Sequence, residues 1–233
     1  MIIFDPVKHA YTNSYTGEVY ESVTTVLGKF KPKFDSDKWS RIVADKRGIP
    51  QDIILSEWAE NTKRSQEYGT HLHKTIEDYA KTGLYEEEDA DIIKAYKAVG
   101  DYVVKDGALF EHCVYNHEYK IAGTADIIYP QGSYFDVFDF KTNKDFKFHS
   151  KYNNNLLAPV SHLSDCEYNN YALQLSMYAY NYHKNTGRKV RSLKIFYWDR
   201  DAKAFNVYPA PYMLSDIKNI LKEYEWQNPS KLA

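Results

Sequence analysis

The sequence predicts an α/β protein with a central mixed β-sheet flanked by helices and an N-terminal helical and hairpin region. Helical patterns fill much of residues 35–105, strand-like runs follow over residues 109–142, and a helix then alternates with two further strands before a last helix. Helices that flank and separate strands in this order are typical of layered α/β domains. With 233 residues, the chain is long enough for one sizeable domain with a small lobe.

The first part of the chain is predicted to contain a hairpin followed by helices. In residues 9–22, Tyr and Val flank a turn at Thr16-Gly17, a pattern typical of a hairpin. Residues 35–46 are predicted to be helical, and residues 51–81 form a second helix, in one or two pieces, that ends at Gly83. One apolar stripe recurs at helical spacing in that helix and predicts a buried face: Tyr68, Leu72, Ile76 and Tyr79.

The acidic run EEEDAD precedes a helix that we expect over residues 90–105. Carboxylates at a helix N-terminus interact favourably with the helix dipole, so we interpret this run as a solvated cap. Strand-like and helical patterns then alternate to the end of the chain. The expected strands are residues 109–116, 119–130, 133–142, 192–201 and 203–210, and the expected helices are residues 168–184 and 215–226.

Composition and charge narrow the class of protein. The net charge is −2 and charged residues make up 27%, values that are ordinary for a soluble protein and do not by themselves indicate a nucleic-acid binder. Cys113 and Cys166 lie far apart, in no spacing typical of a zinc or iron–sulfur site. The N-terminus lacks a signal-peptide pattern, and no apolar run reaches the length of a membrane span. We therefore expect a cytoplasmic location without a membrane partner.

Asp139 and Lys141 are the first candidate site residues. They are two residues apart in a predicted strand, so their side chains point to the same face. Val137, Phe138 and Phe140 make this a buried strand, and a buried ion pair costs several kcal/mol unless it is compensated. This makes a surface ion pair the weaker interpretation. Asp126 on the neighbouring predicted strand adds a second carboxylate, and two carboxylates with a backbone carbonyl suit Mg²⁺.

Two predicted helices supply further candidates. His73 and Glu77 are four residues apart and share a helix face with Gly69, whose missing side chain would allow a close approach to another element. A lone helical histidine is more often structural than catalytic, but here it belongs to a polar line beside the apolar stripe. Gln174 and Tyr178 also share a helix face, which taken alone is ordinary for a packed helix.

Each of these pieces is common by chance, whereas the ordered set is specific. In chain order the pieces are Gly69–His73, Gly123–Asp126, Asp139–Lys141 and Gln174–Tyr178. The order G-x-x-x-H, G-x-x-D, D-x-K, Q-x-x-x-Y closely resembles the PD-(D/E)XK nuclease superfamily, and within it the RecB-like exonuclease branch with its phage and mitochondrial single-strand exonucleases. The resemblance spans residues 68–178. Ala125 stands where the superfamily's name has Pro, which this branch commonly lacks.

The resemblance implies a restriction-endonuclease-like core in a single nuclease domain over residues 1–233. Residues 65–233 would form the nuclease core, and residues 1–64 a hairpin and helical substrate-binding region. It further implies Mg²⁺- or Mn²⁺-dependent hydrolysis of DNA, by an exonuclease acting on single-stranded or end-containing DNA in replication, recombination or repair. The opening H-x-Y and S-V-T-T-V-L segments also resemble phage-type members. Exonuclease or endonuclease action, polarity, and DNA or RNA preference stay open from the residues alone.

Under this resemblance each motif residue has an expected role. Asp126, Asp139 and the Phe140 carbonyl would hold the metal, with His73 as a further ligand. Lys141 would orient or deprotonate the attacking water and offset charge in the transition state. The remaining residues would support the site. Glu77 would hold the other nitrogen of His73 or contact a metal-bound water, and Gln174 and Tyr178 would position the nucleic-acid backbone.

Basic and aromatic residues near these motifs predict a surface for DNA. Lys144, Lys147 and Lys151 follow the D-x-K motif, and residues 29–47 form a second basic stretch that would track phosphates. Lysine-rich loops are as often simply solvated. Aromatic side chains that would stack bases are Phe30, Phe34, Trp39, Tyr168 and Tyr171.

Two other functions compete with a nuclease. A catalytically inactive nucleic-acid-binding module on the same fold would not need Asp126, Asp139 and Lys141. A sugar hydrolase with a carboxylate pair would explain the acids and aromatics but gives no role to Lys141 or His73. The sequence has no G-x-x-x-x-G-K-[ST] phosphate loop, so we expect no fused helicase motor, and replication or recombination proteins would be separate partners.

Overall fold

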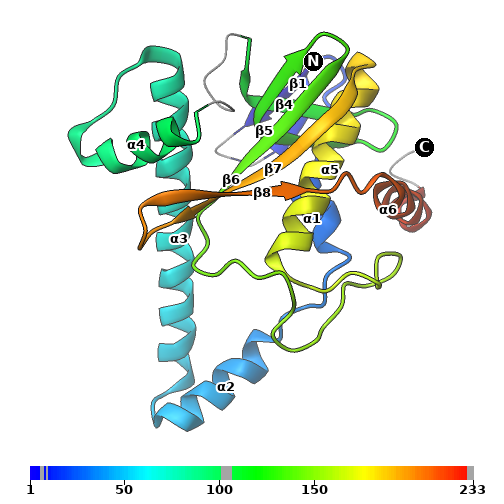
Figure 1. Ribbon diagram of the computed structural model, residues 1–233. Helices are drawn as coiled ribbons and strands as arrows, with labels where there is room; N and C mark the ends of the chain where they lie inside the picture. The colour runs from blue at the N-terminus through cyan, green and yellow to red at the C-terminus, as the bar shows by residue number, and fades with distance from the viewer. Residues whose placement is uncertain (6–7, 9, 101–106, 230–233) are drawn as a thin grey trace.

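A mixed eight-stranded sheet runs through the centre of the computed structural model, with helices on both of its faces (Figure 1). The structure describes residues 1–5, 8, 10–100 and 107–229. This arrangement confirms the α/β class, the mixed sheet and the flanking helices that the sequence predicts. Among the described residues, no helix combines the length and the apolar character that crossing a bilayer requires.

The N-terminal hairpin is present and is extended by one strand. β1 (Ile2–Asp5), β2 (Ala10–Asn13) and β3 (Val19–Ser22) pair antiparallel, and Tyr11 lies opposite Tyr20 across β2 and β3. His9, the first residue of the predicted hairpin, lies outside the described residues. A short helix that we did not expect, α1 (Val23–Gly28), follows directly.

Two helices project from the sheet and meet at their far ends (Figure 1). α2 (Ser36–Arg47) begins at Asp35, whose side chain accepts a hydrogen bond from the Lys38 amide, and it ends at Gly48 in the left-handed conformation. α3 (Gln51–Thr82) is one unbroken helix that ends at Gly83. The helix therefore reaches from α2 to the sheet as a single rigid element.

The segment after α3 differs from the prediction in two respects. α4 (Ala90–Ala98) is shorter than residues 90–105, of which 101–105 lie outside the described residues. The acidic run before it, which includes the short 3-10 helix η1 (Glu87–Asp89), is not a wholly solvated cap. Asp89 is only 6% exposed and accepts hydrogen bonds from Thr75 Oγ1 at 2.9 Å and from His71 Nε2 at 2.7 Å. Its carboxylate ties η1 to α3.

The central strands form a meander followed by a parallel neighbour. β4 (Leu109–Asn116), β5 (Ile121–Gln131) and β6 (Tyr134–Lys141) pair antiparallel in succession, with β5 in the middle. β7 (Lys189–Asp199) then lies parallel to β6, and β8 (Ala204–Ala210) closes that edge. β3 pairs parallel with the first residues of β5, so the hairpin continues the same sheet.

The two faces of the sheet have separate cores. α1, α5 (Glu167–Thr186) and α6 (Leu214–Gln227) cover one face, whereas α3 and α4 cover the other. Side chains alternate along β6, so Val137 packs on the α5 side while Phe138 and Phe140 pack on the α3 side. Asp139 has the parity of Val137 and therefore points toward α5.

Candidate metal centre and catalytic cluster

Asp126 occupies the centre of the cluster, on β5. The residue is 9% exposed, and its Oδ2 accepts a hydrogen bond from the Phe140 amide at 2.6 Å. The same amide bond fixes the carboxylate, so Oδ1 faces α3 and lies 3.4 Å from His73 Nδ1. One carboxylate oxygen is thus used to hold the side chain in place, and the other is presented to the site.

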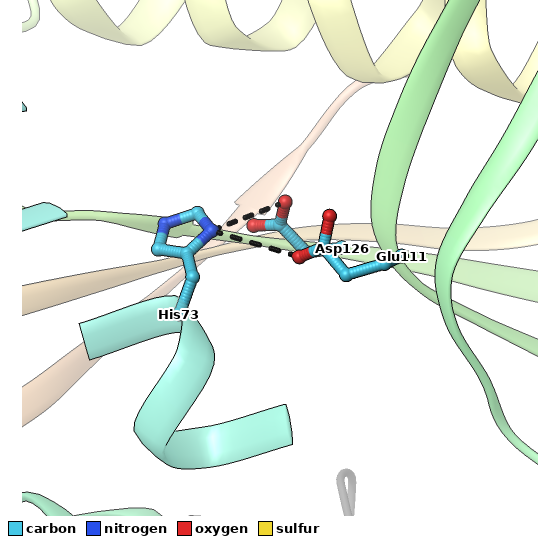
Figure 2. Close-up of side chains that lie close together, drawn as sticks. All are labelled: His73, Glu111 and Asp126. Atoms are coloured by element: carbon cyan, nitrogen blue, oxygen red, sulfur yellow. Dashed lines mark ion pairs between the residues drawn. The ribbon is translucent and has the colours of Figure 1, made fainter. Parts of the chain in front are cut away.

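His73 reaches this carboxylate from α3 (Figure 2). Its Nε2 lies 3.1 Å from the Phe140 carbonyl oxygen. A carbonyl can only accept, so Nε2 carries a proton and donates to Phe140. In the neutral imidazole, Nδ1 therefore keeps its lone pair and points at the carboxylates of Asp126 and Glu111. A backbone carbonyl that fixes the tautomer in this way is typical of metal-ligating histidines.

Glu111 completes the group and was not among the residues that the sequence singled out. Its backbone φ is +45°, a left-handed conformation within β4 that is uncommon for a residue other than Gly. Flanking residues Phe110 and His112 pair with Ile127 and Ala125, which puts Glu111 across from Asp126. Ligand atoms of His73, Glu111 and Asp126 all lie within 4.8 Å of one another.

Asp139 and Lys141 form a buried ion pair beside this group. Lys141 Nζ lies 2.5 Å from Asp139 Oδ2, and Asp139 is 2% exposed. The Lys141 ammonium also lies 4.8 Å from the centre of the Tyr171 ring, on α5. The strand spacing thus puts both charges on the α5 side, as the sequence predicts. Asp139 is not part of the three-residue group, but its charge acts on His73 and Glu111.

The pKa values of the cluster reflect an excess of carboxylates that lie close together. Burial alone would lower the pKa of His73, but the neighbouring Asp126 carboxylate outweighs burial and raises it to about 9. Burial and the Asp126 charge together raise the pKa of Glu111 to about 7. Burial also raises the pKa of Asp139 to about 6, against the opposing charge of Lys141. Protons therefore occupy sites that a metal cation would otherwise neutralise.

Gly69 and Gly123, which open two of the motifs, are both explained by close contacts. A Cβ on Gly123 would lie 2.6 Å from Tyr178 Cε1, so this residue must lack a side chain for Tyr178 to pack against β5. A Cβ on Gly69 would lie 3.2 Å from Thr142 Oγ1, so α3 approaches the end of β6 closely. Gln174 Nε2 donates a hydrogen bond to the Tyr178 hydroxyl at 2.9 Å within the fourth motif, and the Tyr178–Gly123 contact joins that motif to the second.

Two predicted residues lack an expected contact, although the Glu77 charge still acts on Glu111. The Glu77 carboxylate pairs with Lys81, and both nitrogens of His73 face other groups, so Glu77 does not contact His73. Phe30 was expected to stack bases, but it is 2% exposed and belongs to the core on the α5 side, which makes that expectation wrong. Its apolar neighbours in α1 account for its burial. Phe34 and Trp39, by contrast, are 67% and 41% exposed.

A groove of about 500 Å³ opens onto the cluster. It begins at His73 and Lys141 and continues along α3 to Asn61. Polar, uncharged side chains of α3 form one wall, and residues at the end of β6 form the other. The groove thus opens the Asp139–Lys141 side of the cluster to solvent from one side.

Comparisons with known proteins yield little beyond this geometry. No protein-family description and no curated protein matches the sequence. A crystal structure of a protein from Eubacterium rectale, designated a candidate exonuclease, has a TM-score of 0.38 and 10% sequence identity, and covers 88% of this chain and 69% of that chain. The assignment of function therefore depends on the residues of this chain.

Proposed function

We propose that this protein is a metal-dependent deoxyribonuclease of the PD-(D/E)XK type. The observation that supports this most directly is the convergence of His73, Glu111 and Asp126 on one point, next to the buried Asp139–Lys141 pair. The Glu111 side chain is 38% exposed but Asp126 is buried, and carboxylates held this close repel one another, which is costly without a function. A divalent cation resolves that repulsion, and the adjoining ammonium suits the charge of a phosphodiester.

The donor set fits a divalent cation such as Mg²⁺ or Mn²⁺. Carboxylate oxygens of Asp126 and Glu111 are the preferred ligands of both ions, and the His73 imidazole favours Mn²⁺ over Mg²⁺. Asp139 and the Phe140 carbonyl lie beside these groups and would complete the site, although Phe140 already accepts a bond from His73. A bound ion would lower the pKa of its water and polarise the phosphoryl oxygen.

Lys141 acts in this proposal as a fixed cation. Burial alone would lower its pKa, but the carboxylates of Asp139 and Asp126 outweigh burial and raise it, so the group is an ammonium. An ammonium can orient the attacking water and offset negative charge on the transition state, whereas it cannot remove a proton. Gln174 and Tyr178 brace β5 and hold Asp126 in position through the Gly123 contact.

The substrate class follows from the groove and from the resemblance of the motifs. The groove is open along α3, so a single strand can enter lengthwise with its phosphates toward Lys141. We therefore propose exonuclease action on single-stranded or end-containing DNA, with a role in replication, recombination or repair.

End-labelled linear and closed circular DNA, each single- and double-stranded, tests this proposal. The expected result is cleavage of linear single strands with Mg²⁺ or Mn²⁺ and none with EDTA. Resistance of circular single strands would support exonuclease action, and their cleavage would identify an endonuclease. No cleavage of any substrate by protein that binds Mn²⁺ and DNA would instead favour an inactive binding module.

A further inference from the structure

A second cavity lies at the far end of α3, away from the catalytic cluster. Its volume is about 580 Å³, and it lies between α2, α3 and the loop that follows β6. Exposed aromatic side chains dominate it, since Phe34 is 67% exposed, Trp39 41% and Tyr152 68%. Exposed rings that gather at one cavity from two segments of the chain are typical of a binding surface. Trp58, on α3, completes the lining and contacts Phe34 with ring centroids 5.8 Å apart.

The rings of Trp39 and Tyr152 are spaced in a way that suits a nucleobase. They lie nearly parallel, tilted by 26°, with centroids 6.5 Å apart. This separation is close to twice the roughly 3.4 Å spacing of stacked bases, so a small outward movement of the exposed Tyr152 ring admits one base. Each ring also has a lysine over it. Lys38 Nζ lies 5.8 Å from the centre of the Trp39 ring, and Lys151 Nζ lies 5.7 Å from the centre of the Tyr152 ring.

The charges around this cavity favour a phosphate backbone. Lys33 and Lys38 line it, and Lys151 adjoins it. The lining also holds Asp35 and Asp165, which keep their negative charge, so three ammonium groups face two carboxylates that are already hydrogen-bonded. Asp35 caps α2 by accepting from the Lys38 amide, and Asp165 accepts from Asn170. A polyanion with planar bases matches this combination of ammonium groups and rings.

α3 connects the aromatic cavity to the catalytic cluster. Trp58, Thr62, Ser65, Gly69 and His73 follow one another at three- and four-residue intervals and so share one helix face. Residues 59–67 are exposed throughout, and Figure 1 shows this part of the helix bare between α2 and the sheet. The charged residues of this stretch pair within the helix, Arg64 with Glu60 and Lys63 with Glu67. Between Trp58 and His73, the shared face therefore carries only the polar, uncharged side chains of Thr62 and Ser65 and the bare backbone of Gly69.

We propose that this face and the aromatic cavity form one binding track for single-stranded nucleic acid. The proposal rests on the nuclease function, because it places the reacting phosphate at the His73 end and a stacked base between Trp39 and Tyr152. Trp58 and His73 are fifteen residues apart, which corresponds to about 22 Å along a helix. That length equals about six or seven stacked nucleotides. The track thus sets a minimum strand length for tight binding.

Binding of fluorescently labelled oligo(dT) in EDTA tests the track without cleavage. Trp39→Ala is expected to weaken binding of a 12-nucleotide strand roughly tenfold and to leave the affinity for a three-nucleotide strand unchanged. Trp226→Ala is the matched control, because Trp226 is 77% exposed but lies on α6. Tyr152→Ala should resemble Trp39→Ala, which guards against a folding defect in α2. An RNA strand and duplex DNA of equal length test the kind of nucleic acid.

The outcomes separate this inference from the nuclease function. Equal affinity of the wild type and Trp39→Ala for the 12-nucleotide strand would overturn the track, even if metal-dependent cleavage is intact. Tighter binding of duplex than of single strands would also overturn it. Weakened binding by Trp39→Ala in a protein that cleaves nothing would support the track and contradict the nuclease.

Discussion

The cluster of His73, Glu111, Asp126, Asp139 and Lys141 has more negative than positive groups. When ionised, the carboxylates of Glu111, Asp126 and Asp139 face the cations of His73 and Lys141. The structure relieves this imbalance with protons, since the pKa values of His73, Glu111 and Asp139 are all raised. A divalent cation would replace those protons, which couples metal binding to pH.

Metal affinity should therefore rise with pH. At pH 8, His73, with a pKa of about 9, still holds a proton that the metal must displace. Below about pH 7, Glu111 holds a second proton. We expect the affinity for Mn²⁺ to increase about tenfold per pH unit between pH 7 and 9, and more steeply below pH 7. Calorimetry in buffers of different ionisation enthalpy measures the protons released, and Glu111→Gln should remove the steeper part. An affinity independent of pH would contradict the ligand assignment.

Stability without metal should change in the opposite direction. The raised pKa of His73 means that its contribution to folding is complete below about pH 6.5 and is lost as pH rises through about 9. Protonated Glu111 and Asp139 likewise favour the folded state, and these contributions are lost by pH values of about 7 and 6. The melting temperature in EDTA should fall between pH 6 and 9, and added Mn²⁺ should restore it most at pH 9. A melting temperature in EDTA that does not change with pH would show that the pKa values of these groups are not raised in the folded protein.

Lys141 and Lys147 should differ in kinetics. Lys141 lies inside the cluster, whereas Lys147 lies in the loop beyond β6 and pairs with exposed Asp145 at 2.8 Å. Lys141→Ala should reduce the single-turnover rate by about 100-fold or more and change DNA affinity little. Lys147→Ala should keep its rate at saturating DNA and, if it tethers phosphate, reduce the salt slope of binding by about one unit. Identical behaviour of both variants would remove Lys141 from the chemistry.

For single residues, the sequence predicts most of the candidate site but not every residue that the fold brings into it. The sequence alone predicts that Asp139 and Lys141 share a strand face and that Gly69 and His73 share a helix face. Each prediction follows from the regular repeat of side chains within one strand or one helix. The sequence does not predict Glu111 as a site residue, because no local pattern marks it. The pairing of β4 with β5 and the left-handed backbone at Glu111 place it in the site.

At the scale of elements, Gly123 is the residue that most constrains packing. An alanine there would bring Cβ within 2.6 Å of Tyr178 and 3.1 Å of Val23, both in the core. Gly123→Ala should lower the free energy of unfolding by about 1–3 kcal/mol, measured by urea denaturation. Gly28→Ala is the matched control, because a Cβ there meets nothing within 4 Å. Equal stabilities of the two variants would mean that Tyr178 does not pack against β5 as described.

Elements were predictable where the pattern was long. α3 and α5 match their predicted positions to within two residues, because caps and apolar spacing agree over many turns. Short or mixed signals were less informative. β1 and α1 were not predicted, and Asp89 was interpreted as solvated because its partners, Thr75 and His71, belong to another element.

At the scale of the molecule, the antiparallel meander of β4, β5 and β6 assembles the site. It places Glu111, Asp126 and Asp139 on adjacent strands, although 28 positions separate the first from the last. α3 then brings His73 to one edge of this row, and α5 brings Tyr178 to the face that Asp139 occupies. The order of elements along the sequence predicts a mixed sheet. Only the residue pairing between β4, β5 and β6 shows that these three carboxylates lie together.

The central claim is that Asp139 and its neighbours perform chemistry. Asp139→Asn keeps the side-chain volume, and Asp136→Asn is its control. Asp136 is equally buried on β6 but bonds to Arg191 and Ser192, outside the cluster. The measurement is the single-turnover cleavage rate of linear single-stranded DNA in Mn²⁺, per folded molecule. We predict a loss of at least about 100-fold for Asp139→Asn and an unchanged rate for Asp136→Asn. A folded Asp139→Asn protein that cleaves at the wild-type rate would contradict the account.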